Sequence, residues 1–225
     1  MKYRWGIWLS LVFGLLLSVS LIASAQLPAG ISREETLIVD QLTGRVGMPN
    51  NFNLWAGWRN QDRGIQQLLL EPLWTVDYAT GEIISGMAAE LPIYNEDFTQ
   101  MTIKLREGTY WSDGVPVTAD DVIFTIDIHI KTPGLLYHGP MAEYVEKVSK
   151  ADEHTVVVDL KIPNSRFHTH FLDRWGCLRI MPKHIFEKAE DQLTFEYNPP
   201  VGNGPYILYD YDPAGFWTLW ERRED

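Results

Sequence analysis

Cysteine is nearly absent from this chain of 225 residues, in which Cys177 is the single example. One cysteine forms no disulfide within the chain, so an exported form would fold without disulfide crosslinks. It also excludes zinc sites built on Cys-x-x-Cys pairs, which need several thiolates at fixed spacing. A chain of this length can bury a core large enough to fold unaided.

Positive charge is also scarce, with 19 Lys and Arg against 30 Asp and Glu, which gives a formal net charge of −11. Lys2 and Arg4 are the only charged residues before Gln26, so the chain from Gln26 onward carries −13. Because an acidic surface repels a phosphate backbone, nucleic acid is a poor partner for this protein.

Long apolar runs are missing except near the N-terminus, where residues 7–22 are broken only by Ser and Gly. Lys2 and Arg4 precede this run, and the small-residue sequence Ala-Ser-Ala at 23–25 follows it, just before Gln26. This order is typical of a secretory signal peptide. The alternative is an uncleaved membrane anchor, for which the run is slightly short. No cysteine follows the run, so we expect an exported protein, in the periplasm or at the outer face of the cell membrane, that is not a lipoprotein.

Catalytic motifs are missing as well. The sequence has no Gly-x-Ser-x-Gly elbow and no Ser-x-x-Lys with a partner motif. The glycine-rich stretch 202–205 does not suit a phosphate, because Pro205 removes an amide donor. Six histidines, including His168, His170 and His184, show no His-Glu-x-x-His pattern. We therefore expect neither an enzyme nor a bound metal or other cofactor.

Apolar residues that alternate with polar ones predict strands, and apolar residues three or four apart predict helices. Strands are expected at 36–40, 101–105, 144–149, 155–162, 206–211 and 216–220, and a hairpin over 73–84 that turns at 79–81. Helices are expected at 62–71, with Asp62 as N-cap, at 119–131, and from Pro182 at position N1 to about Glu190. Residues 135–140 are expected to form a loop.

The helix at 119–131 has the strongest local signals. Asp113 and Gly114 form a turn pair, and Pro116 ends strand pairing. Thr118 and Asp121 have the spacing of a capping box, with Asp in place of the usual Glu or Gln. Four apolar residues form its expected buried face: Val122, Ile123, Ile126 and Ile130.

The run from Leu105 to Thr125 reads LREGTYWSDGVPVTADDVIFT. It resembles the signature of the family 5 extracellular solute-binding proteins, roughly L-R-x-G-x-x-W-S-D-G-x-P-x-T-A-D-D-V-x-F-T. These are the dipeptide-, oligopeptide- and nickel-binding components of ABC importers. Val117 stands where Phe is more usual and Tyr110 where a polar residue is more usual, and neither change disturbs the turn or the cap.

Three shorter passages resemble the same family. Residues 87–91 are similar to its L-A-E-x-(W/Y) passage, and 182–184 match its Pro-Lys-His. Residues 202–206 are similar to its G-T-G-P-Y turn, with Asn203 in place of Thr. The resemblance extends from Thr36 to Asp225, while family members are about twice as long or more, so we expect a fragment or a truncated gene product.

The resemblance implies an α/β, periplasmic-binding-protein-like fold with two lobes, of the large family 5 type within class II. Residues 1–25 would be the signal peptide. Residues 26–60 and 178–225 would form the hinge-side mixed-sheet subdomain of lobe one, and 61–177 the additional subdomain that carries the signature. The second lobe would be absent, together with the Asp by which family peptide binders hold the peptide ammonium group.

In function, the resemblance implies capture of an oligopeptide between two lobes for an ABC import system, by a monomer whose partner is the membrane permease. An oligosaccharide is the alternative ligand. A sensory or regulatory protein that reuses the fold is a hypothesis of another class. Such regulators carry an N-terminal helix-turn-helix, where this chain has an export signal. A secreted hydrolase fragment is disfavoured by the missing motifs.

Aromatic residues are the best candidates for ligand contacts, because their faces suit sugar rings and peptide side chains. Trp55 and Trp58 lie in a polar loop with Asn53, and in the family this loop borders the ligand cleft. Tyr137 and Trp175 are further candidates. The alternative for Trp55 and Trp58 is that they only attach the loop to the domain.

Three of the other tryptophans lie in strand or turn contexts and are expected in the core: Trp74, Trp111 and Trp217.

Overall fold

The computed structural model describes residues 32–38, 50–55, 65–174 and 176–224. The chain divides into two units, Met1–Val39 and Asp40–Asp225. In the first unit, the 3-10 helix η1 (Arg33–Glu35) is followed by Thr36–Ile38 without regular structure, so the described part of the strand expected at 36–40 is not a strand. The expected signal peptide lies outside the described residues. Within the described ranges, every helix is too short or too polar to cross a bilayer.

The second unit contains a four-stranded antiparallel sheet in the order β3-β4-β6-β5. Its strands are β3 (Ile93–Tyr94), β4 (Gln100–Lys104), β5 (Val145–Asp152) and β6 (Thr155–Leu160). Met101 pairs with Val158 and Ile103 with Val156, and all four side chains are fully buried. The expected strands at 101–105, 144–149 and 155–162 are therefore confirmed, and their period of two sets the buried face.

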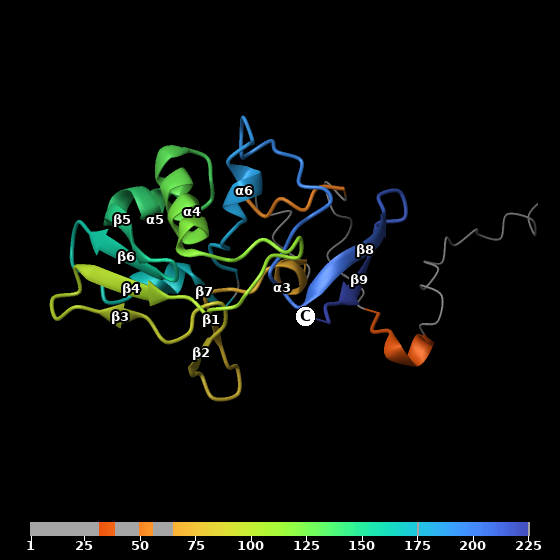
Figure 1. Cartoon of the computed structure of the whole chain (residues 1–225), viewed down its shortest axis with the longest axis horizontal. Helices are drawn as coiled ribbons and strands as arrows, with labels where there is room; N and C mark the ends of the chain where they lie inside the picture. The colour runs from red at the N-terminus through yellow and green to blue at the C-terminus, as the bar shows by residue number, and fades with distance from the viewer. Residues whose placement is uncertain (1–31, 39–49, 56–64, 175, 225) are drawn as a thin grey trace, which may run out of the picture. The chain divides into compact units, whose positions relative to one another are not determined.

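Two helices, α4 (Ala119–Lys131) and α5 (His138–Tyr144), lie over one face of this sheet (Figure 1). α4 has the predicted bounds, and the Asp121 carboxylate accepts a hydrogen bond from the Thr118 N–H at 2.9 Å, as a capping box requires. The loop expected at 135–140 was wrong in its second half, because α5 begins at His138. Pro140 is tolerated there because amides of a first helical turn need no intrahelical acceptor.

A three-stranded sheet has the order β2-β1-β7, formed by β1 (Trp74–Val76), β2 (Ile83–Ser85) and β7 (Leu172–Asp173). β1 and β2 are the expected hairpin, and Gly81 takes a φ of +78° in its turn. β7 pairs with β1 in parallel, and the 3-10 helix η2 (Phe167–His170) precedes it.

The helix expected at 62–71 is present as α3 (Ile65–Leu69), while Asp62 lies outside the described residues. α3 ends before Glu71 because the 202–205 turn hydrogen-bonds the last carbonyl of the helix and an amide just beyond the helix. The Gly204 N–H donates to the Leu69 carbonyl at 2.9 Å, and the Asn203 side-chain oxygen accepts from the Glu71 N–H at 3.2 Å.

The last elements are α6 (Lys183–Phe186) and the ribbon of β8 (Tyr206–Asp212) and β9 (Trp217–Arg222), which confirms both expected C-terminal strands. α6 is shorter than expected, and Pro182 is its N-cap rather than N1. After Phe186 the backbone turns by i→i+3 bonds, with the Ala189 N–H donating to the Phe186 carbonyl at 3.2 Å, and the Gln192 side-chain amide also donates to the carbonyls of Phe186 and Ala189.

Trp74 and Trp111 are fully buried as expected, whereas Trp217 is half-buried.

Candidate functional site

The loop at residues 50–55 is held by the Asn53 side chain, which is 0% exposed. Its amide nitrogen donates to the carbonyls of Gln192 and Phe195, both at 2.9 Å, and its oxygen accepts from the Trp55 N–H at 2.9 Å. Because both ends of the amide bond to backbone, Asn53 fixes the position of Trp55 within the domain.

Trp55 is an interior aromatic residue, only 3% exposed. Its indole N–H donates to the Arg179 carbonyl at 3.3 Å. The ring meets His129 and Phe186 edge to face, at centroid distances of 4.9 and 4.8 Å. In this arrangement the ring packs in the core and offers no wide open face.

Trp55 and Tyr137, two of the sequence-predicted residues, line one narrow hollow that has no room for a water molecule. We call it the Trp55 hollow, and its lining residues are Leu54, Trp55, Tyr137, Cys177, Leu178 and Arg179. Whole-ligand pockets measure about 300–1,000 Å³, so this narrow space is packing between buried side chains and not a ligand pocket. Asn53 does not line it, and Trp58 and Trp175 lie outside the described residues.

Burial keeps three titratable groups near the hollow uncharged: Tyr137, Cys177 and His129. Desolvation raises the pKa of the Tyr137 hydroxyl well above its ordinary value and that of the Cys177 thiol to about 12. A thiol that stays protonated at neutral pH is neither a nucleophile nor a metal ligand. Burial also lowers the pKa of His129 to about 4, so this imidazole is neutral at pH 7.

A buried ion pair at the hollow is a feature that sequence reasoning missed. The Arg179 Nη2 lies 2.5 Å from Asp173 Oδ2, with side chains 1% and 11% exposed. Arg179 Nη1 also donates to the Leu70 carbonyl at 2.7 Å. The local sequence gives no signal for this ion pair, because a single Arg between apolar residues is equally consistent with a position on the surface.

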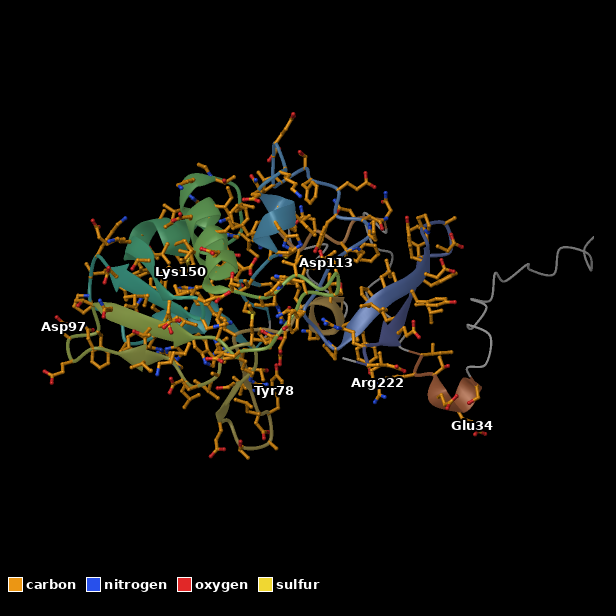
Figure 2. All side chains as sticks on the ribbon, viewed as in Figure 1. Glu34, Tyr78, Asp97, Asp113, Lys150 and Arg222 are labelled. Atoms are coloured by element: carbon orange, nitrogen blue, oxygen red, sulfur yellow. The ribbon has the colours of Figure 1, made fainter. Side chains whose placement is uncertain are left out.

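The signature packs against the other family-like passages rather than around a ligand. Asp121 Oδ1 accepts from the Lys183 N–H at 2.9 Å, and its Oδ2 also accepts from the Trp111 indole at 3.4 Å. Asp113, labelled in Figure 2, lies 2.8 Å from His184 Nε2. Two carboxylates of the signature therefore contact the Pro-Lys-His passage. Asp121 does so from α4, and Asp113 does so from the turn that precedes α4.

The 202–205 turn completes this junction. The Ser112 N–H donates to the Gly202 carbonyl at 2.8 Å, and the Gly202 N–H donates to the Ser112 hydroxyl at 3.2 Å. A Cβ at Gly202 would lie 1.9 Å from the Leu69 carbonyl oxygen, so this close approach requires glycine. The signature thus forms the structural junction between α3, α4 and the 202–205 turn.

Among the described residues, no group of three or more His, Cys, Asp or Glu side chains is placed to hold a metal. His168 Nδ1 lies 3.1 Å from the Tyr94 hydroxyl, while the His170 ring packs on Phe167. The two histidines therefore face different neighbours.

Comparison with known proteins agrees with this arrangement. A sequence model of the bacterial extracellular solute-binding proteins, family 5 Middle, matches residues 82–225. The oligopeptide-binding protein AppA of Bacillus subtilis is 26% identical over 184 residues, which cover 80% of this chain and 33% of AppA. An uncharacterized protein, y4wM, from Sinorhizobium fredii is 32% identical over 146 residues, which cover 62% of this chain and 21% of that protein.

Solved structures of solute-binding proteins also match this chain. The periplasmic oligopeptide-binding protein of an oligopeptide ABC transporter from Thermotoga maritima has a TM-score of 0.69 at 28% identity, over 79% of this chain and 32% of that one. Its mannohexaose-bound structure has the same TM-score at 29% identity, over 78% and 31%. The chain spans about a third or less of the length of these relatives. The chain belongs to the family 5 extracellular solute-binding proteins, which are binding components of ABC importers and not enzymes.

Proposed function

We propose that this chain is the first-lobe part of an exported protein that captures oligopeptides for an ABC importer. The observation that carries the proposal is the similarity to the Thermotoga maritima oligopeptide-binding protein over 79% of this chain. The solute would lie between this lobe and a second one, and lobe closure would present both to the membrane permease. We place the protein in the periplasm or at the outer face of the membrane, as a monomer.

In this proposal the subdomains keep the boundaries expected from the sequence, with 26–60 and 178–225 beside the hinge and 61–177 as the additional subdomain. The ligand contacts that this chain supplies would be those expected from the sequence, namely Asn53, Trp55, Trp58, Tyr137 and Trp175.

An oligosaccharide is the second candidate solute. It is favoured by the mannohexaose-bound structure of the Thermotoga maritima protein, which is 29% identical to this chain.

The test is titration of the purified chain with trialanine, a pool of random nonapeptides and mannohexaose, followed by NMR of the tryptophan indole N–H groups. A two-lobed binder with a Kd of about 1 µM that kept half of its binding free energy would have a Kd of about 1 mM. We therefore expect millimolar peptide binding that shifts the Trp55 indole resonance. A response to mannohexaose alone would favour the second candidate, and no response to any probe at 10-fold excess over about 1 mM would count against solute capture.

A further inference from the structure

Asn203 is the only asparagine in the chain that precedes a glycine. An Asn-Gly pair is the sequence most prone to spontaneous deamidation, because glycine has no side chain to hinder attack by its own nitrogen on the asparagine amide. The family's turn has Thr in place of Asn203, and threonine has no side-chain amide to lose. This chain therefore carries a reaction at the 202–205 turn that a relative with Thr in this position lacks.

The reaction consumes only water, and its atoms balance in two steps. The Gly204 nitrogen loses its proton and bonds to Asn203 Cγ, the Cγ–Nδ2 bond breaks, and ammonia leaves with that proton. Water then opens the resulting succinimide ring at either carbonyl, which gives aspartate or isoaspartate in place of asparagine. In isoaspartate the main chain runs through Cβ and Cγ, so the backbone of the turn becomes longer by one CH₂ group.

Both reacting groups are held by the end of α3 in the folded chain. The Gly204 N–H donates to the Leu69 carbonyl at 2.9 Å, and the Asn203 side-chain oxygen accepts from the Glu71 N–H at 3.2 Å. Ring closure requires the nitrogen to give up its proton and the side-chain amide to rotate toward it. Both hydrogen bonds must therefore break before the ring can close.

The docked turn also has no space in which to rearrange. A Cβ at Gly204 would lie 2.4 Å from the Leu68 carbonyl oxygen, and a Cβ at Gly202 would lie 1.9 Å from that of Leu69. An added CH₂ group in the backbone of the turn would meet the same atoms, because neither side of this contact can give way without moving main chain.

We propose that Asn203 is a deamidation site protected by the junction of the 202–205 turn with α3, and that it reacts only while this junction is open. A turn that contains isoaspartate cannot dock again, so the reaction makes a transient opening permanent. No step of it involves a bound solute, so the site is independent of the proposed function.

The first test compares deamidation of Asn203 in the folded chain and in the chain unfolded by guanidinium chloride, both at mildly alkaline pH. Mass spectrometry of tryptic peptides measures the deamidated fraction, and labelling by isoaspartyl methyltransferase identifies isoaspartate. We expect the folded chain to react at least about tenfold more slowly, because a protected junction is open for only a minor fraction of the time. Equal rates in the two states, or no reaction in the unfolded chain, would overturn the proposal.

Ser112→Ala tests the junction without altering either reacting group. It removes the hydroxyl that accepts the Gly202 N–H at 3.2 Å, so deamidation of the folded chain should be at least about threefold faster. Thr109→Ala, whose hydroxyl bonds the Arg106 carbonyl in the same loop, is the matched control and should react at the wild-type rate. A wild-type rate in Ser112→Ala would contradict the protection by the junction.

If Ser112→Ala does not fold, the wild-type chain in urea below its unfolding midpoint decides. Faster deamidation before global unfolding is expected, and acceleration only with global unfolding would refute a local opening.

Asn203→Thr tests the permanent effect. Each chain is incubated in guanidinium chloride and refolded, and its isoaspartate-containing fraction is separated by ion exchange. That fraction of the wild type should have a lower Tm than before, whereas Asn203→Thr should regain its starting Tm. Full recovery of Tm by the wild-type fraction with isoaspartate would show that the modified turn docks again, against the proposal.

Discussion

His129 gives this fold a specific sensitivity to acid. Its ring lies on the buried face of α4, 1% exposed, and Nδ1 lies 2.8 Å from the Thr125 carbonyl. The ring contacts Trp55 and Tyr137, and its backbone carbonyl is bonded by the His138 ring. Among the described residues, Nε2 has no partner. A proton added at Nε2 would therefore have neither water nor an acceptor nearby.

The size of the effect follows from the two pKa values. Burial lowers the pKa of His129 from 6.5 to about 4 in the folded protein. As the pH falls from 6.5 toward 4, the unfolded chain takes up a proton that the folded one refuses, so stability is lost through this window. Between pH 7 and pH 4.5 the loss attributable to this residue is about 2 kcal/mol.

The substitution His129→Phe tests this reasoning, because phenylalanine keeps an aromatic ring beside Trp55 and cannot titrate. Urea unfolding at several pH values from 7 to 4.5, followed by tryptophan fluorescence, should show a loss smaller than in wild type by about 2 kcal/mol. Burial also lowers the pKa values of His168 and His170, but both remain in the variant, so the difference isolates His129.

Ile126→Val, on the same face of α4, is the matched control. It should lower stability by about 1 kcal/mol at every pH, since it removes a methyl group and no titrating group. If His129→Phe lost stability toward pH 4.5 as steeply as wild type, the buried imidazole would not be the acid-sensitive group.

Three further substitutions test the internal junctions, each by urea unfolding at pH 7. Gly202→Ala places a Cβ 1.9 Å from a backbone oxygen of α3 and should cost about 1–3 kcal/mol, so an unchanged midpoint would contradict the close approach. Asp121→Ala leaves three N–H donors without their acceptor and should cost about 3 kcal/mol, whereas Asp127→Ala on the same helix should stay within about 0.5 kcal/mol. Asn53→Ala removes the side chain that ties the loop and should cost about 2 kcal/mol, with a wild-type midpoint as the contrary result.

Elements with local signals were predictable from the sequence. α4 has the predicted bounds because its cap at Thr118 and its flanking turn are read within a few residues. The strand β4 was predictable because its alternation of apolar and polar residues lies within one short segment. By contrast, the early end of α6 was not predictable, because the Phe186 carbonyl is bonded by the Gln192 side chain six residues further on, a contact that no helix pattern includes.

The candidate site was less predictable because its neighbours come from distant segments. Trp55 lies in a polar loop, and that context suggested an accessible ring. Its burial depends on His129 and Phe186, which are more than 70 residues away in sequence. The charged pair was missed for the same reason, since only the folded chain places Arg179 beside Asp173.

The longest sequence resemblance and the residues expected to contact the solute are thus different parts of the chain. Asp121 receives backbone donors from both Thr118 and Lys183, so one carboxylate caps α4 and also holds the start of α6. Lys150 on β5 adds an ion pair to Asp120 in the first turn of α4, at 2.8 Å (Figure 2). Replacing either aspartate changes the junction but no residue that lines the Trp55 hollow. A signature made of such contacts can identify the fold without specifying the solute, because its carboxylates are used to hold α4 and α6 in place.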